Sequence, residues 1–312
     1  MLAKPDQLPK FICPRTRQPL VQEGGTWRTD NNEHTYKIID GFPIFVDFES
    51  SVLNVQDFES LHVPEVVERR KYGGLMSLAK KLVSPPKSAT AANISELMSL
   101  LTNKSKEKNP RVLIIGAGSI GQGMQPLYDS SQIEIVAFDV YASKHIQFIA
   151  DAHSIPFEND AFDAVIIQAV LEHVLEPSKV VSEIYRVLKK KGMVYSETPF
   201  LQHVHEGAYD FTRFTESGHR YLFKHFSLIK SGASAGGGTQ LIWAIDNFSR
   251  GLFRSRIAGK VIKLLFFWLI YLDELIPEKY NVDAASGCYF LGRKSDKEIT
   301  PKEAIAHYQG AQ

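Results

Sequence analysis

A glycine-rich loop is the first feature of the sequence that could do chemistry. It directly follows the apolar run 112–115, and its residues are Gly116, Ala117, Gly118, Ser119, Ile120 and Gly121. Glycines after a buried strand permit a tight turn and let a ligand approach the backbone. Asp139 ends the next predicted strand, where a carboxylate can accept hydrogen bonds from ribose hydroxyls. The pattern predicts a nucleotide-type cofactor, with a purely structural glycine turn as the alternative.

Two cofactors fit that geometry, a nicotinamide dinucleotide and S-adenosylmethionine (SAM), and four further motifs decide between them. These are DAHSIPF at 151–157, FDAVII at 162–167, QAVLEHV at 168–174 and RVLKKKG at 186–192. With them, residues 110–232 resemble the class I SAM-dependent methyltransferases, in the methyltransferase type 11 group related to the ubiquinone and menaquinone enzymes. A dehydrogenase would show none of the last three motifs. The resemblance implies an enzyme that uses SAM.

The resemblance also assigns cofactor contacts by position. Asp139 would hold the ribose hydroxyls, Asp151 would accept from the adenine amino group, and the backbone of Ala152 would contact the ring. The glycine loop would lie along the ribose and methionine portions through Gly116, Ala117, Gly118 and Gly121. Gln168 and Ala169 would face the methionine part. Glu172 and His173 open the next helix and are interpreted as structural rather than as an acid/base pair.

The segment 200–215 mixes polar and aromatic residues in a way that suits neither a core strand nor a disordered loop. In the first interpretation His205 or Asp210 is the general base, Arg213 anchors an acidic or phosphorylated substrate, and His203 and Tyr209 line the substrate site. In the second, His203, His205 and Asp210 bind a divalent metal. In the third, Asp210 and Arg213 form a structural ion pair. The first is preferred, with no metal assigned.

The same segment carries a further resemblance. Its pattern, PFLxxxHxxxxDFxRFT, is similar to methyltransferases of surface-polysaccharide biosynthesis. This resemblance implies O-methylation of a small-molecule or sugar hydroxyl, on an acceptor linked to a lipid or a nucleotide. The second hypothesis is a catalytically silent SAM-fold protein that binds a partner. A nicotinamide-dependent oxidoreductase is the third.

The elements that must position these residues alternate between strands and helices. Apolar runs at 112–115, 133–138 and 164–167 predict strands buried on both faces, and 177–191 predicts an amphipathic helix before a strand at 193–195. We expect an α/β fold, a doubly wound, mostly parallel seven-stranded sheet of the Rossmann-like methyltransferase type. Only residues 140–146 separate the second and third strands. The helix between them should therefore be rudimentary, and the third strand is a candidate for displacement.

The chain divides into four expected parts. Residues 1–48 form a small N-terminal β unit, 49–109 a helical linker, 110–295 the methyltransferase domain and 296–312 a tail. Residues 8–46 resemble a small zinc-ribbon-like domain that activates some methyltransferases, on the stretches LPKFICP and YKIIDGFPI. Thr16 stands where the metal-binding version has its second cysteine, and the other cysteine pair is missing. The unit is therefore expected to be metal-free.

Residues 236–283 form a helical insertion between the last two predicted strands. It opens with three glycines, 236–238, interpreted as a flexible hinge. A basic flank then precedes an aromatic-rich apolar stretch, so that 254–272 could contact a membrane surface, cover the substrate cleft or form a homodimer interface.

Composition excludes several classes of protein. Lys plus Arg number 36 and Asp plus Glu 35, so bulk charge gives no reason to expect nucleic acid as a partner. Two cysteines exclude a disulfide scaffold. The longest apolar run, 264–272, is far shorter than the roughly 20 residues that span a bilayer, and the N-terminus shows no secretory signal. We expect a cytoplasmic protein, with membrane association as an option.

Overall fold

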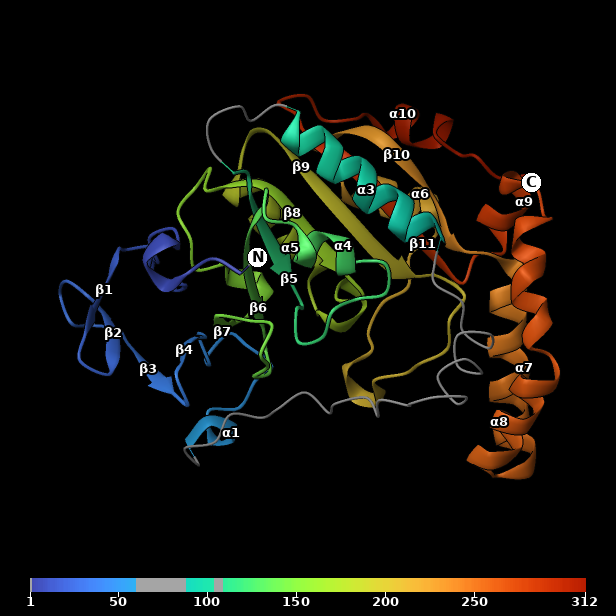
Figure 1. The fold of residues 1–312 in the computed structure, drawn as a ribbon, viewed down its shortest axis with the longest axis horizontal. Helices are drawn as coiled ribbons and strands as arrows, with labels where there is room; N and C mark the ends of the chain where they lie inside the picture. Colours follow the sequence, from blue (N-terminus) through green and yellow to red (C-terminus); the bar gives the residue numbers. More distant parts are fainter. Residues whose placement is uncertain (1, 60–87, 104–108) are drawn as a thin grey trace.

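The computed structural model describes residues 2–59, 88–103 and 109–312. Seven strands form the centre of one sheet, in the order β7-β6-β5-β8-β9-β11-β10. Only β11 runs antiparallel to its neighbours. The doubly wound, mostly parallel α/β sheet is thereby confirmed (Figure 1). The strands are β5 (Arg111–Ile115), β6 (Glu134–Asp139), β7 (Phe148–Ala150), β8 (Phe162–Gln168), β9 (Leu188–Pro199), β10 (Phe226–Ala235) and β11 (Gly287–Lys294).

Alternate residues of the central strands enter two separate hydrophobic cores, one on each face of the sheet. Leu113 and Ile115 of β5 belong to one core, and Val112 and Ile114 to the other. Helix α5 (Pro177–Val187) fills the first core with four apolar side chains. The second core contains apolar side chains of α3 (Ser88–Thr102) and of the short α4 (Gln125–Asp129). Burial on both faces explains why these strands read as continuous apolar runs.

Helix α5 ends earlier than the sequence pattern indicated. The predicted helix reached Lys191, but the backbone turns extended at Leu188, and β9 begins there. The reason lies in the sheet, because Leu188 pairs with Phe162 of β8. Lys191 takes a left-handed backbone conformation just before Gly192.

The connection between β6 and β7 contains no helix at all. Gln147 ties it down instead, because its side chain donates to the Ile135 carbonyl at 3.0 Å and accepts from the Ala137 N–H at 2.7 Å. Strand β7 is short, but it is not displaced, and it pairs in parallel with β6. The option of a displaced third strand is therefore wrong.

The N-terminal residues extend the same sheet. A meander of β1 (Leu20–Glu23), β2 (Thr26–Thr29), β3 (Thr35–Ile39) and β4 (Phe42–Phe45) ends with β4 parallel to β7, so the sheet has eleven strands. Phe11 stacks on Phe157 at 4.9 Å and contacts Phe45 at 4.4 Å between ring centroids. These aromatic contacts bury the unit against the domain. The buried Cys13 thiol lies 3.1 Å from the Tyr36 hydroxyl. The metal-free state of this unit stays a prediction.

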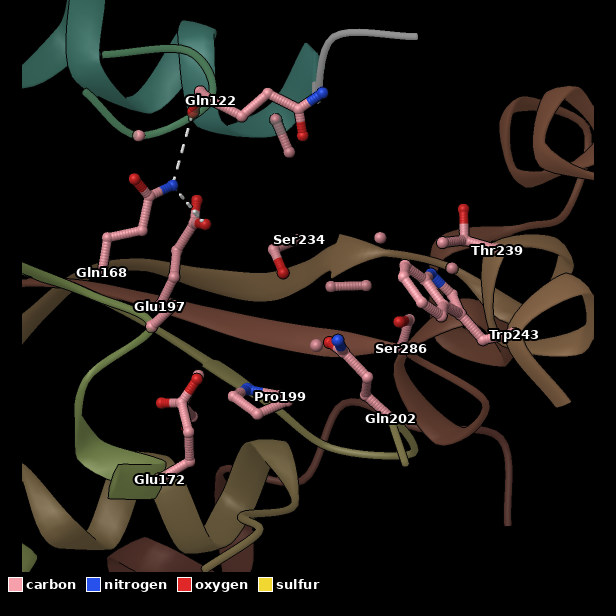
Figure 2. A pocket seen from close by; sticks show the side chains of 18 of the residues that line it. Gln122, Gln168, Glu172, Glu197, Pro199, Gln202, Ser234, Thr239, Trp243 and Ser286 are labelled. Atoms are coloured by element: carbon pink, nitrogen blue, oxygen red, sulfur yellow. Dashed lines mark hydrogen bonds between the residues drawn. The ribbon is translucent and has the colours of Figure 1, made fainter. Parts of the chain in front are cut away.

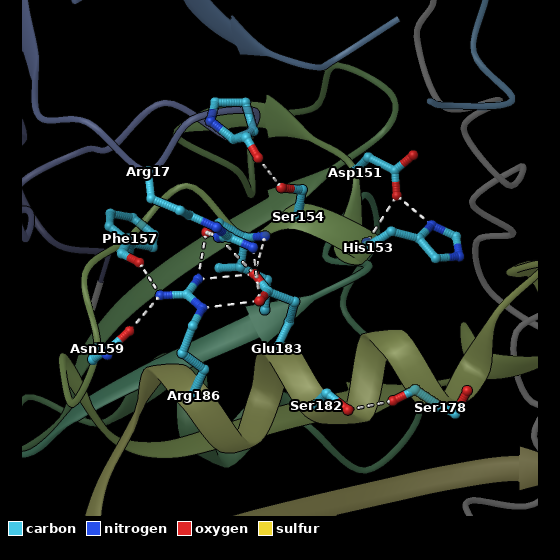
Figure 3. A network of polar contacts seen from close by, with 12 residues as sticks. Arg17, Asp151, His153, Ser154, Phe157, Asn159, Ser178, Ser182, Glu183 and Arg186 are labelled. Atoms are coloured by element: carbon cyan, nitrogen blue, oxygen red, sulfur yellow. Dashed lines mark hydrogen bonds and ion pairs between the residues drawn. The ribbon is translucent and has the colours of Figure 1, made fainter. Parts of the chain in front are cut away.

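A buried carboxylate also joins the N-terminal unit to α5 (Figure 3). Glu183 accepts two hydrogen bonds from Arg17 at 2.9 Å, and two from Arg186 at 2.8 and 2.9 Å. The Ile155 N–H adds a fifth at 2.9 Å. Burial alone would raise the pKa of Glu183, but hydrogen bonds and charge from Arg186 and Arg17 outweigh it and hold the pKa below its usual value.

We therefore expect Glu183→Gln to lower the free energy of unfolding by about 1.5–3 kcal/mol at pH 7. Because the folded state lowers this pKa, the stabilisation is present above the unfolded pKa, near 4.3, and is lost as the pH falls through the folded value. Urea unfolding at pH 7 and pH 3 measures both effects. The exposed Glu158→Gln is the matched control. An equal loss at both pH values would contradict this account.

The insertion is a helical hairpin followed by irregular turns. Helix α7 (Gly237–Phe253) and helix α8 (Arg256–Leu265) run side by side, followed by the 3-10 segment η5 (Phe267–Glu274) and by α9 (Glu278–Asp283) (Figure 1). The predicted stretch 254–272 is thus two elements, since α8 stops at Leu265. Within the described part of the chain, no helix combines the length and apolar character needed to cross a bilayer.

The three glycines are not a flexible hinge. The Asp273 carboxylate accepts from the backbone N–H groups of Gly236 and Gly238, at 3.0 and 2.6 Å, and from the Thr239 hydroxyl at 2.5 Å. A Cβ at Gly238 would overlap the Leu269 carbonyl oxygen. The glycines therefore permit close packing of the start of α7 against η5.

The predicted linker 49–109 is described only in part, because 60–87 and 104–108 lie outside the described residues. Within it, α3 is a core helix whose Ile94 and Leu97 are fully buried. The remaining short elements are η1 (Pro5–Gln7), α1 (Gln56–Glu59), η2 (Ala152–Ser154), η3 (Leu171–His173), η4 (Gly207–Tyr209), α6 (Glu216–Leu222) and α10 (Pro301–Ala306).

Candidate active site

A cavity of about 780 Å³ opens at the carboxyl ends of β5, β8 and β9, where open α/β sheets bind their ligands. One wall is the glycine loop, and the opposite wall comes from the insertion through Thr239, Trp243 and Tyr271. Figure 2 shows Gln168, Glu197 and Glu172 on the sheet side, and Thr239 and Trp243 across from them. The volume suits a cofactor together with a small acceptor.

The glycine loop has the backbone that its sequence predicted. Gly116 has a φ of +78°, and a Cβ there would overlap the Val170 side chain. A Cβ at Gly121 would overlap the Gln168 amide. Gly116 is therefore required where it stands, and both glycines line the cavity. The loop does not open directly into a helix, because α4 begins only at Gln125 and has five residues.

Asp139 lies at the carboxyl end of β6 and holds the loop in place. Its Oδ2 accepts from the Gly118 N–H at 2.6 Å, and its Oδ1 from the Val140 N–H at 2.7 Å. Burial raises the pKa of Asp139, and these backbone donors lower it in part. A carboxylate offers about four acceptor positions, and the contact of Asp139 with ribose hydroxyls stays a prediction. Ala117, Gly118 and Asp139 are not among the residues that line the cavity.

Asp151 is placed differently from the prediction. It lies in a second cavity of about 250 Å³ with residues of the N-terminal unit, among them Pro14 and Asp47. Its Oδ1 accepts from the backbone and ring of His153, at 2.9 and 2.6 Å, and its Oδ2 accepts from the Ser51 hydroxyl at 2.5 Å. The structure therefore does not bring Asp151, or the buried Ala152 beside it, to the main cavity, and a direct contact with adenine stays a prediction.

The floor of the cavity is a hydrogen-bonded group centred on Glu197, which the sequence did not single out. Its carboxylate accepts from the Thr90 hydroxyl at 2.5 Å, from the Tyr195 hydroxyl, and from the Gln168 amide at 2.8 Å (Figure 2). Gln168 is thereby fixed at the end of β8. The one signal in the sequence was Glu197 itself, a charged residue near the carboxyl end of the strand β9.

Ala169, next to Gln168, also lines the cavity as predicted for a methionine contact. Its φ of +55° is a left-handed conformation that alanine rarely adopts. Its N–H donates to the Glu197 carbonyl at 3.0 Å, which holds this turn against β9.

His205 reaches the cavity and is oriented by Asp210. The His205 Nδ1 lies 3.2 Å from Asp210 Oδ2, and the His205 backbone N–H donates to the same oxygen at 2.9 Å. The Arg213 guanidinium beside Asp210 holds the pKa of that carboxyl well below its usual range. Asp210 is thus ionised and a poor base, and it holds the His205 backbone, whereas the ring Nδ1 has the His203 carbonyl within hydrogen-bond distance at 3.4 Å.

Arg213 is a structural residue in this arrangement, contrary to the prediction that it anchors the substrate. Its Nε donates to the Gln202 carbonyl at 2.9 Å, and the remaining N–H groups donate to Asp210 and to the carbonyls of Thr212 and His203. A guanidinium has five donors, and all five are occupied. The guanidinium has none left for an acidic group.

The other two predicted substrate residues also lie off the cavity wall. His203 contributes only its backbone carbonyl to the contacts named above, and its side chain is exposed. Tyr209 is half exposed, and its carbonyl accepts from His173 Nδ1 at 2.7 Å. The set His203, His205 and Asp210 is therefore not assembled as metal ligands.

A different cluster forms instead from Glu172, His173 and His205. One ligand atom from each lies within 4.8 Å of the others, with Glu172 Oε1 at 3.7 Å from His173 Nε2 and 4.0 Å from His205 Nε2. A tetrahedral ion at about 2.1 Å would hold such atoms about 3.4 Å apart. The cluster is wider than that. Burial lowers the pKa of His173, which favours its neutral form.

The mostly parallel sheet, the glycine loop and the carboxylate beside it form a site of the kind that binds nucleotide-type cofactors. Residues 74–196 match the family described as a methyltransferase domain. The chain therefore carries a class I SAM-dependent methyltransferase domain, and its cofactor is SAM. Both predictions from the sequence are confirmed.

Two curated relatives are demethylmenaquinone methyltransferases. The protein of Clavibacter sepedonicus is 35% identical over 68 residues, which cover 22% of this chain and 28% of the relative. That of Renibacterium salmoninarum is 37% identical over 92 residues, which cover 26% and 38%. The chain thus matches well under half of the length of either relative.

Among solved structures, a phosphoethanolamine N-methyltransferase of Haemonchus contortus in complex with SAM is similar, with a TM-score of 0.45. It is 14% identical, and the match covers 81% of this chain and 62% of that one.

Proposed function

We propose that the protein transfers a methyl group from SAM to a hydroxyl of a small molecule or sugar. The observation that carries this proposal is the His205–Asp210 pair at the cavity wall, facing the sheet end where the glycine loop lies. A hydroxyl must lose its proton as it is methylated, and an oriented imidazole is the usual acceptor. A hydroxyl depends on such a base more than a thiol does, because a thiol is already partly ionised at neutral pH.

When bound, SAM supplies an electrophilic methyl group on a sulfonium. The His203 carbonyl, 3.4 Å from His205 Nδ1, can accept the Nδ1 proton, so that the Nε2 lone pair can take the proton of the acceptor hydroxyl. The imidazolium that forms then has a carboxylate near each ring nitrogen, Asp210 at 3.2 Å from Nδ1 and Glu172 at 4.0 Å from Nε2.

The insertion wall supports a ring-shaped polar acceptor. Trp243 offers a flat apolar surface, and Thr239 and Gln202 offer hydrogen-bonding groups to the same space (Figure 2). A mixture of one aromatic face and a few polar groups is typical of sites that orient a small ligand. A sugar hydroxyl carried on a lipid or nucleotide fits this description.

The proposal is tested with methyl-labelled SAM. Purified protein is incubated with nucleotide-linked sugars and with lipid-linked glycans, and the label is followed into each fraction. We expect a product whose label survives alkali, as a methyl ether does and a methyl ester does not. Tight SAM binding with no transfer to any fraction would favour a catalytically silent SAM-fold protein.

A further inference from the structure

The α7–α8 hairpin exposes a set of large apolar side chains on its outer surface, here called the hairpin patch. On α7 they are spaced i, i+4, and on α8 i, i+4, i+7, so each helix carries an apolar stripe. Between 52% and 73% of each side chain is exposed, for Phe248, Leu252, Phe253, Ile257, Val261, Leu264 and Leu265. Soluble proteins rarely leave such a surface uncovered, and it marks an interaction site.

The charges around the hairpin patch have one sign. Between Gly237 and Leu265 there are five basic residues, of which four are exposed, Arg250, Arg254, Arg256 and Lys260. The single acid, Asp246, is buried and paired with Arg250 at 2.7 Å. On α8 the basic residues occupy i, i+4, i+7 from Arg256, beside the apolar stripe. Apolar side chains flanked by lysine and arginine are typical of helices that lie in a membrane interface.

Helices α7 and α8 pack closely against each other, so the hairpin patch is a surface with a defined shape. A Cβ at Gly259 of α8 would overlap Asp246 of α7, which shows how closely the helices approach. Lys263 lies 4.1 Å from the Trp243 ring centroid across the hairpin. The start of α7 is fixed to η5 by Asp273, as described above. The outer surface therefore keeps its shape while the inner side, through Trp243 and Lys263, walls the cavity.

We propose that the hairpin patch docks onto an anionic lipid bilayer, with its apolar side chains in the interface and its basic residues on the headgroups. A second copy of the chain fits the same surface less well. In a two-fold dimer the patch would face itself, and the exposed arginines and lysine would repel one another. A bilayer with anionic lipids supplies both the apolar layer and the opposite charge.

One consequence deepens the acceptor assignment and rests on the proposed function. Because the hairpin forms a wall of the cavity, membrane docking would bring the cavity beside the headgroups. Of the two acceptor classes left open above, a lipid-linked one is then favoured.

The test uses full-length protein and sedimentation with vesicles of phosphatidylcholine, alone or with phosphatidylglycerol. Wild type should bind the anionic vesicles, bind neutral ones weakly, and lose binding as salt is raised. Arg254→Gln/Arg256→Gln/Lys260→Gln should weaken binding to anionic vesicles roughly 100-fold. Phe248→Ser/Leu252→Ser/Ile257→Ser should weaken it at least about tenfold. Lys302→Gln/Ile305→Ser on α10 removes an exposed lysine and an exposed isoleucine elsewhere and should change nothing.

Calorimetric titration with SAM accompanies each variant and shows that the domain is folded, whatever the acceptor proves to be. The proposal is overturned if wild type does not sediment with anionic vesicles. It is also overturned if light scattering shows a dimer that the apolar substitutions dissociate while vesicle binding is absent. If the wild-type protein binds anionic vesicles but transfers no methyl group to any acceptor, the result counts against the proposed function alone.

Discussion

His205→Ala is expected to lower methyl transfer by roughly 10²–10⁴-fold, the usual contribution of a positioned general base. SAM affinity should not change, because His205 lies outside the glycine loop and the Asp139 contact. Turnover with the identified acceptor and calorimetric titration with SAM measure the two quantities separately. The physical reason is positional, since His205 is the side chain of the 200–215 segment that Asp210 turns toward the cavity.

His203→Ala is the matched control, because it removes the same side chain two residues away from a position off the cavity wall. It should retain turnover within about threefold, a change of under 1 kcal/mol. Asp210→Asn should lose less than His205→Ala, since Asp210 orients the imidazole and is not itself the base. Thermal unfolding of this variant reports the loss of the Arg213 ion pair, which is a separate effect.

A chelator distinguishes a metal site from a base. If Glu172, His173 and His205 closed around a divalent ion, activity would vanish with chelator and return with the ion, and His173→Ala would be as damaging as His205→Ala. Full activity in the His205→Ala/Asp210→Asn double variant would show that the pair is a structural feature of the loop.

Replacement of Asp139 gives the second large effect, on the cofactor. We expect Asp139→Ala to weaken SAM binding roughly ten- to hundredfold, because a hydrogen bond between a ribose hydroxyl and a carboxylate contributes about 1.5–3 kcal/mol. The loss has a second source, since the Gly118 N–H also loses its partner and the glycine loop loosens. Calorimetric titration with SAM and S-adenosylhomocysteine measures it.

Asp129→Asn is the control for Asp139, since it removes an exposed carboxylate whose hydrogen bond, among the described residues, is with the exposed Gln125 side chain. It should leave SAM affinity unchanged. Unchanged SAM affinity in Asp139→Ala together with tight NAD binding would contradict the assigned role of Asp139.

Local patterns predicted the central sheet and the cofactor side of the cavity. Runs such as 112–115 are typical of strands buried on both faces, and a glycine at 116 with a positive φ marks the turn that follows. These features depend on a few consecutive residues, and the structure reproduces them with Asp139 beside the loop. Residues 188–191 show the limit of such patterns, because pairing of Leu188 with β8 ended α5 before its sequence pattern did.

Features that depend on residues far apart in the chain came only from the tertiary structure. Arg213 looked like an anion anchor, but carbonyls of 202, 203 and 212 use donors that a sequence cannot count. Asp273 lies far along the chain from the glycines it caps, so the glycines suggested flexibility where the structure has close packing.

The same holds for the site as a whole. The sequence by itself determined the class of fold, the cofactor and the loop that contains His205. It could not determine that β4 would extend the sheet beside β7, that Asp151 would face the N-terminal unit, or that Glu172 would meet His205. Local backbone preference and burial pattern are properties of neighbouring residues, whereas these contacts depend on how strands and loops pack in space, which fixes the chemistry of the site.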